Sequence, residues 1–186
     1  PILSTRRATI GLSHGGFSLT HRVILIRHAK SSWDDAGADD HARVLNRRGR
    51  WSARALGTWI RDGGYRPQEF LSSDSARTRE TVDRMQADWE DPIPVTYLPT
   101  LYHASPQILL EVLRAATVPH VALVAHNPGI GYFAGAMTAH PPRHPKFHQY
   151  PTCATTIVDF AISNWRDATP GQGRVVDFIV PRDLTP

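Results

Sequence analysis

The apolar residues of the chain recur with two different spacings. Residues 22–27, RVILIR, are nearly all apolar and rich in β-branched side chains, which is typical of a strand covered on both faces. Across residues 45–64, LNRRGRWSARALGTWIRDGG, the apolar positions follow helical spacing until Gly63 and Gly64 end the pattern. The buried face of this helix is expected to consist of Trp51, Ala55, Leu56, Trp59 and Ile60.

Strand and helix patterns continue to alternate toward the C-terminus. Ser105 is an expected N-cap before Pro106, and Asp74 or Ser75 is expected to cap another helix. The alternation predicts an α/β three-layer sandwich with a mainly parallel central sheet, helices on both faces and an antiparallel edge formed by the last two strands. The predicted strands span residues 70–73, 94–98, 121–126, 155–162 and 174–180. The predicted helices run from the Asp74 or Ser75 cap through residue 89, from Pro106 through residue 116, and over residues 131–139.

We expect one globular domain over residues 22–186. The chain has 186 residues and is 41% hydrophobic, which suits a single core. Residues 1–21 lack acidic groups and show no clear period. We interpret them as a loose N-terminal extension, and a transit sequence stays open as the alternative.

The composition excludes several classes of function. The single cysteine, Cys153, rules out an intramolecular disulfide framework and a thiolate metal cluster, and it fits a reducing, cytoplasmic compartment. No apolar run approaches the ~18 residues of a membrane span, so we expect no membrane partner. The net charge of +4 and the pI near 9.6 suit anionic ligands. Scattered Lys and Arg, without an aromatic and basic platform or a helix-turn-helix pattern, argue against nucleic acid.

A histidine-rich loop is the one candidate for a metal site. His140, His144 and His148 have helical spacing, but Pro141, Pro142 and Pro145 forbid the helix that would align them, so a loop without metal is favoured. We expect no metal and no cofactor.

Polar groups suited to phosphate follow three of the predicted strands. Arg27 and His28 follow the first strand, Arg77 lies at the start of the helix after the second, and His126 ends the fourth. Because ligands of such sheets bind beyond the carboxyl ends of the strands, these side chains are expected to meet in one crevice. Arginine offers a planar fork of donors for phosphate oxygens. Two arginines and two histidines supply the charge that phosphoryl transfer needs without a metal.

Four motifs carry a resemblance to a known family. They are LIRHAKSSW, LNRRG, LSSDSARTRET and VAHNPGI, each at an expected strand end or helix start. Through these motifs, residues 22 to about 180 resemble the histidine phosphatase superfamily, which has the phosphoglycerate mutase-like fold. RHAK, SSDSARTRET and HNPG are most similar to the short SixA-type bacterial phosphohistidine phosphatases.

The resemblance implies a covalent mechanism. His28 attacks phosphorus as a neutral imidazole, and Arg27, Arg77 and His126 hold the transferring group until water releases phosphate. The second ring nitrogen of His28 needs a fixed acceptor, such as a backbone carbonyl, to select the attacking tautomer.

The proton donor is open between two candidates. Mutase-like relatives carry a glutamate between the second arginine and the second histidine, and LPTLYHAS places His103 in roughly that position. Asp34 or Asp35 is the competing candidate, and Asp34 is also a candidate substrate-binding residue. An imidazole leaving group departs once its ring is protonated, so a weak acid suffices for a phosphoramidate. This favours phosphohistidine as the substrate.

Two neighbouring features have no assigned role in the reaction. Asp40 and Arg43 either form a structural pair that orients the pocket or a surface salt bridge. Lys30 is interpreted as an ordinary solvated lysine.

Three functions remain open. The favoured one is a phosphatase acting on phosphohistidine in proteins or on a small phosphate monoester; the others are phosphoglycerate mutase-type phosphoryl transfer and an inactive anion-binding module. The short separation between Arg77 and His126 leaves little room for an insertion that encloses a small substrate. A phosphorylated protein is therefore the favoured partner, and we expect a monomer or weak dimer.

Overall fold

The apolar runs form a six-stranded sheet in the computed structural model, which describes residues 20–34, 37 and 39–184. The predicted extension at residues 1–21 lies outside the described residues except for Thr20 and His21, and His21 already belongs to the first strand. The strands are β1 (His21–Arg27), β2 (Glu69–Ser72), β3 (Val95–Tyr97), β4 (His120–Ala125), β5 (Thr155–Phe160) and β6 (Arg174–Ile179).

The strand order is β3-β2-β4-β1-β5-β6. The pairs among β3, β2, β4 and β1 are parallel, whereas β5 is antiparallel to both β1 and β6. This confirms the predicted mainly parallel sheet with an antiparallel edge. The helices are α1 (Arg47–Asp62), α2 (Ala76–Gln86), α3 (Pro106–Ala115) and α4 (Gly129–Met137), with short 3₁₀ helices at Pro99–Leu101, Trp165–Asp167 and Pro181–Leu184.

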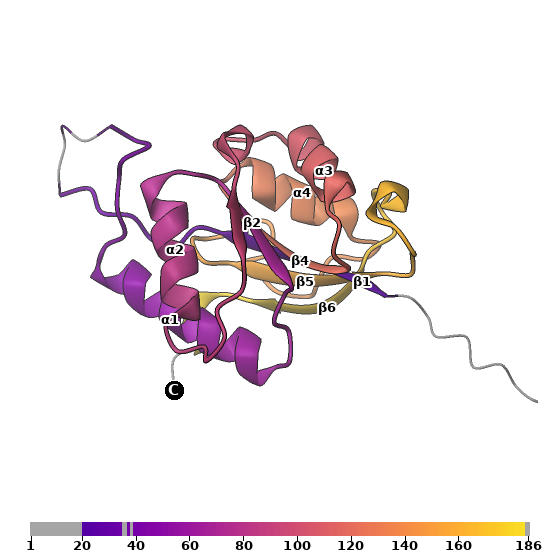
Figure 1. Cartoon of the computed structure of the whole chain (residues 1–186), viewed down its shortest axis with the longest axis horizontal. Coiled ribbons are helices and arrows are strands. Elements are labelled where there is room, and N and C mark those ends of the chain that lie inside the picture. The colour runs from indigo at the N-terminus through magenta and orange to yellow at the C-terminus, as the bar shows by residue number, and fades with distance from the viewer. Residues whose placement is uncertain (1–19, 35–36, 38, 185–186) are drawn as a thin grey trace, which may run out of the picture.

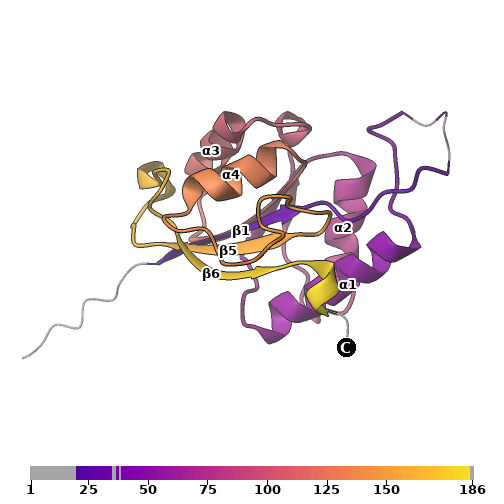
Figure 2. The same ribbon diagram turned by 180° about the vertical axis from the view of Figure 1, so that it is seen from behind.

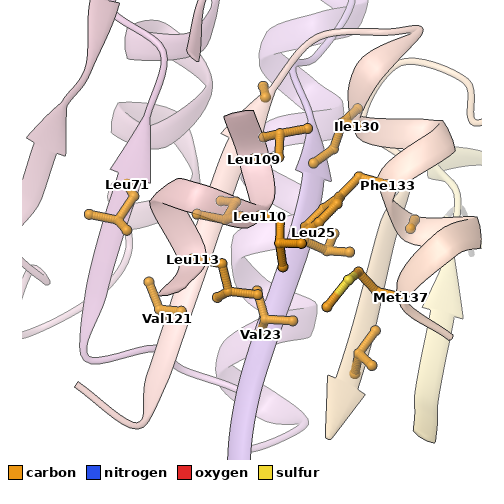
Figure 3. Packing of buried hydrophobic residues seen from close by; sticks show 14 of the residues in the cluster. Val23, Leu25, Leu71, Leu109, Leu110, Leu113, Val121, Ile130, Phe133 and Met137 are labelled. Atoms are coloured by element: carbon orange, nitrogen blue, oxygen red, sulfur yellow. The ribbon is translucent and has the colours of Figure 1, made fainter. Parts of the chain in front are cut away.

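Helices cover both faces of the sheet, as the three-layer prediction requires. Figure 1 shows α3 and α4 on one face and α1 and α2 toward the other, and Figure 2 shows the same layers from behind. Side chains of β1 alternate between two hydrophobic clusters: Val23 and Leu25 pack toward α3 and α4 (Figure 3), whereas Ile24 and Ile26 pack toward α1 and α2. The nearly continuous apolar run of β1 therefore reflects burial on both sides.

The register of the central strands brings three strand ends to one edge. Arg27 at the end of β1 is opposite Ala125 at the end of β4, and Ser72 at the end of β2 is opposite Val124. The next residues along β1 and β4 are His28 and His126. Parallel pairing alone therefore places these two histidines side by side.

The buried face of α1 differs from the predicted one. Trp51 is 45% exposed, and Ala55 and Trp59 are only partly buried. Leu56 and Ile60 are buried as predicted. Small residues take the rest of the inner face because α2 packs closely against it, and the backbone of Met85 leaves no room for a side chain at Gly57. The buried residues of α1 are Gly49, Ser52, Ala53, Leu56, Gly57 and Ile60.

The contact between Gly57 of α1 and the backbone of Met85 in α2 leads to a stability prediction. A Cβ atom at Gly57 would lie 1.9 Å from the carbonyl oxygen of Met85. We expect Gly57→Ala to destabilise the protein by about 1–3 kcal/mol, because overpacking against backbone exceeds the gain in helix propensity. Gly135→Ala in α4 is the control, because a Cβ there meets nothing within 4 Å. Urea unfolding should separate the two variants, and a Gly57→Ala protein as stable as the parent would contradict this packing.

Candidate active site

A pocket of about 410 Å³ opens where β1, β2 and β4 end. It brings together the four side chains that the strand ends predicted to meet, although they come from three separate parts of the sequence. His103 and Asp40 also reach it from two further loops. The charged and histidine side chains that line it are Arg27, His28, Lys30, Asp40, Arg77, His103 and His126.

His28 is held in one orientation and one tautomer. Its backbone N–H donates to the carbonyl oxygen of Ala125, and its Nδ1 lies 2.7 Å from the carbonyl oxygen of Ala29. Because a carbonyl can only accept, Nδ1 carries the proton and Nε2 keeps its lone pair. Burial first, and then the charges of Arg77 and Arg27, lower the pKa of His28 to about 3. The imidazole is therefore neutral at physiological pH.

Arg27 is held against the same edge of the sheet by backbone. Its Nη1 donates to the carbonyl oxygen of Tyr150 at 2.9 Å, and that oxygen also accepts from the side-chain amide of Asn127. Burial, followed by the charge of Arg77, lowers the pKa of the Arg27 guanidinium. It remains charged, and its Nε has no hydrogen-bond partner among the described residues.

Arg77 and His126 form a buried pair. Arg77 lies in the first turn of α2, and His126 directly follows β4. The Nη2 of Arg77 lies 3.2 Å from the Nδ1 of His126, and the Nε2 of His126 lies 2.9 Å from the hydroxyl of Ser73. Since a guanidinium can only donate, Nδ1 accepts and Nε2 carries the proton. Burial, together with His28 and Arg77, lowers the pKa of His126 to about 2.

Asp40 connects Arg77 to the rim of the pocket. Its Oδ2 accepts from the Tyr102 hydroxyl at 2.6 Å and from the Nη2 of Arg77 at 3.0 Å, and it lies 3.3 Å from the Nε2 of His103. These contacts, that with Tyr102 first, hold the pKa of the carboxyl group well below its usual range. Arg43, its expected partner, lies 3.8 Å away. Asp40 therefore positions Arg77 more directly than it pairs with Arg43.

His103 and Asp34, the two tentative residues, lie in different places. The ring of His103 lines the pocket and stacks on His126, with centroids 5.1 Å apart and an angle of 20° between the rings. Asp34 is exposed, and its carboxylate accepts from the Ser32 hydroxyl. It is not among the residues lining the pocket. Asp35 lies outside the described residues.

The histidine-rich segment forms a loop, as its prolines predicted. His144 lies 3.4 Å from Asp183. Within the described ranges, no group of three or more His, Cys, Asp or Glu residues is placed to hold a metal ion. Among the helices of residues 20–34, 37 and 39–184, none is long and apolar enough to cross a membrane.

Sequence reasoning missed the residues that hold the pocket in place. Ser73, Tyr102 and the link from Asp40 to Arg77 were not foreseen. Ser73 follows β2 within the motif LSSDSARTRET, so its place at a strand end was the one available signal. Asp40 and Tyr102 are each far from Arg77 in sequence, and only the fold brings them together.

The two neutral histidines predict how stability depends on pH. The pKa values of His28 and His126 are lower in the folded protein than the usual value of about 6.5. Between that value and about 3, the unfolded chain binds more protons, so stability rises with pH and is lost on acidification. Each histidine contributes up to about 1.4 kcal/mol per pH unit. Above the unfolded value the contribution is constant.

Urea unfolding in phosphate-free buffer at pH 7.5, 6.0 and 5.0 measures this dependence. The His126→Gln protein should show a shallower loss of stability than the parent, because one of the two groups is gone. The matched control is His140→Gln, at an exposed position, which should follow the parent. Parallel curves for the parent and His126→Gln would show that His126 is not held neutral.

The sheet and its pocket define the class of protein. Two histidines and two arginines meet at the carboxyl ends of the strands of a six-stranded α/β sheet, which is the phosphoglycerate mutase-like fold. Residues 23–104 match the histidine phosphatase superfamily (branch 1).

Relatives and solved structures cover most of the chain. Rv1276c, an uncharacterized protein of Mycobacterium tuberculosis, is 30% identical over 166 residues, which is 84% of this chain and 100% of that protein. A crystal structure assigned as the phosphohistidine phosphatase SixA from Agrobacterium tumefaciens is 30% identical, with a TM-score of 0.72, and the match covers 87% of this chain and 98% of that chain. SixA complexed with tungstate shares the fold at 22% identity, with a TM-score of 0.71 and coverage of 88% and 99%. This chain belongs to the histidine phosphatase superfamily.

Proposed function

We propose that the protein is a phosphatase that transfers a phosphoryl group first to His28 and then to water, and that its substrate is phosphohistidine in a protein. Membership of the superfamily supports phosphatase activity. The observation that carries the proposal is the fixed tautomer of His28, whose Nδ1 donates to Ala29 and leaves Nε2 with a lone pair in a cationic pocket. A nucleophile of this kind needs no base to remove a proton before attack.

In the first step, the Nε2 of His28 attacks phosphorus and the bond from phosphorus to the leaving group breaks. The proton stays on Nδ1, which donates a hydrogen bond to the Ala29 carbonyl oxygen, so the phosphorylated ring carries a positive charge that the phosphoryl oxygens balance. Arg27 and Arg77 donate to those oxygens. In the second step, water attacks phosphorus, the P–N bond breaks, and its electron pair returns to Nε2 as phosphate leaves.

His103 is the proposed proton donor to the leaving group. Asp40 is the one carboxylate among the described residues lining the pocket, and its lowered pKa keeps it ionised, so it accepts hydrogen bonds instead of supplying a proton. His103 lies 3.3 Å from that carboxylate, and of the three histidines that line the pocket it is the one with no role in binding or attacking the phosphoryl group. A histidine donor is adequate for an imidazole leaving group. This supports phosphohistidine over an alkyl phosphate monoester.

A substrate panel in the presence of EDTA tests the proposal. The panel contains a phosphohistidine peptide, an aryl phosphate, 3-phosphoglycerate and a nucleoside monophosphate. We expect phosphohistidine to be hydrolysed with the highest kcat/KM and the activity to survive EDTA, because the arginines and histidines supply the charge that a metal would give.

Two results would contradict the proposal. Complete loss of hydrolysis in EDTA, restored by a divalent ion, would show that a metal supplies part of the site. Isomerisation of phosphoglycerate without hydrolysis of any member of the panel would assign the protein to the mutases.

A further inference from the structure

A second hollow adjoins the candidate pocket. It has a volume of about 420 Å³ and shares Lys30, Pro151 and Thr152 with the pocket. From these shared residues it extends between α1, the loop at residues 144–152 and the 3₁₀ helix Pro181–Leu184. We call it the basic hollow. A ligand with one group in the pocket can therefore place a neighbouring group in the hollow.

The hollow is lined by more positive than negative charge. Four cationic side chains contribute to it: Lys30, Arg48, Lys146 and Arg182. Asp183 is its one carboxylate among the described residues, and that group is engaged, since its Oδ2 accepts from the backbone N–H of Val180 and lies 3.4 Å from the Nε2 of His144.

Three of the cations have no partner of opposite charge among the described residues. Over the ranges that the structure describes, neither Lys30 nor Arg48 has a carboxylate within ion-pair distance, and Lys146 donates to the neutral side chain of Gln149 at 3.0 Å. Like charges gathered in a hollow attract anions and raise their local concentration. Lys30 was interpreted from the sequence as an ordinary solvated lysine, but it lines both hollows and can contact a ligand that spans them.

We propose that the basic hollow binds an acidic segment of the phosphorylated protein whose phosphoryl group enters the candidate pocket. This inference rests on the proposed function, because it takes a phosphoprotein as the substrate. Neither hollow is an enclosed cavity, so a chain can lie across both. Asp or Glu residues next to the phosphorylated residue would meet Arg48 and Lys146, whereas the phosphoryl group meets Arg27 and Arg77.

The experiment uses two peptides of equal length with a central phosphohistidine, flanked by Glu residues in one and by Gln residues in the other. Hydrolysis is measured on both. Binding is measured by fluorescence anisotropy on the same pair carrying a non-hydrolysable phosphonate in place of the phosphoryl group. The test variant is Arg48→Gln/Lys146→Gln. Its matched control is Arg47→Gln/Arg143→Gln, which removes two exposed neighbouring charges that line neither hollow.

The parent protein should bind the Glu phosphonate about tenfold more tightly than the Gln phosphonate, and added salt should reduce the difference. The test variant should lose this preference, and the control variant should keep it. Hydrolysis of a small aryl phosphate should be the same in all three proteins, because that substrate does not reach the hollow.

The possible failures are distinguishable. Equal binding of both phosphonates by the parent, or a preference that survives in the test variant, overturns the inference even if both peptides are hydrolysed. A second result also overturns the inference: the parent binds both peptides equally but binds a sugar bisphosphate more tightly than its monophosphate, and this difference in affinity depends on Arg48 and Lys146. That result would assign the hollow to a small molecule. If neither phosphohistidine peptide is hydrolysed but the binding preference follows Arg48 and Lys146, the proposed function fails and the docking site stands.

Discussion

The His28→Ala protein is expected to lose turnover of phosphohistidine and aryl phosphate substrates, with a fall in kcat on the order of 10⁶, as for the removal of a nucleophile in other covalent enzymes. His28 is the one histidine of the pocket whose Nε2 is free of hydrogen bonds in the described residues, since the Nε2 of His126 donates to Ser73 and that of His103 faces Asp40. No neighbouring group presents an equivalent lone pair to the incoming phosphorus.

Initial rates measured with both substrates test this expectation, and two controls separate chemistry from folding. The His140→Ala protein changes an exposed histidine away from the pocket and should keep the parent rate. The far-UV and near-UV circular dichroism of His28→Ala should match the parent. A folded His28→Ala protein that still hydrolyses phosphohistidine at a comparable rate would rule out His28 as the nucleophile.

Replacement of Arg77 should produce the second largest loss. Arg77 is 4% exposed and contributes donors to Asp40 and His126 at the edge of the pocket. Removing one preorganised donor to a developing anion typically lowers kcat by about 10²–10³. We expect a loss of this size for Arg77→Gln. Arg77→Lys should recover little of it, because one ammonium cannot reproduce the planar fork that reaches Asp40, His126 and a phosphoryl oxygen together.

Arg79→Gln is the matched control on the same helix. Arg79 is exposed, donates to the carbonyl oxygen of Asp74 and stacks on Tyr97, outside the pocket. Its kcat/KM should equal that of the parent. If Arg77→Lys and Arg79→Gln were both as active as the parent, general positive charge near α2 would be sufficient and the directed contacts of Arg77 would have no role.

The sequence was informative about the strand ends because two strong signals coincide there. A continuous apolar run that stops at a charged or imidazole side chain marks where a buried strand reaches solvent, and Arg27, His28 and His126 all occupy that position. The order of strands in an α/β sheet then limits where those ends are placed. The fold class and the convergence of Arg27, His28, Arg77 and His126 were predictable on these grounds.

The surroundings of those residues were not predictable in the same way. Asp40 reaches Arg77 from a loop, and nothing in the local sequence distinguishes that contact from the nearer one to Arg43. The face of α1 was predicted from its large apolar residues, but close packing against α2 required small ones and left Trp51 partly exposed. Asp34 was placed by proximity in sequence, but its exposed carboxylate pairs with Ser32 and does not line the pocket, although its neighbour Trp33 does. Such details depend on tertiary distances.

The phosphoenzyme tests the central claim most directly. The protein is mixed with labelled phosphohistidine peptide, quenched in alkali within the turnover time, and digested for mass spectrometry. We predict label on His28 that is stable in base and released by acid, as a phosphoramidate bond requires. Label on His103 or His126, or turnover with no trapped label on His28 under conditions where the intermediate accumulates, would contradict the covalent role assigned to this histidine.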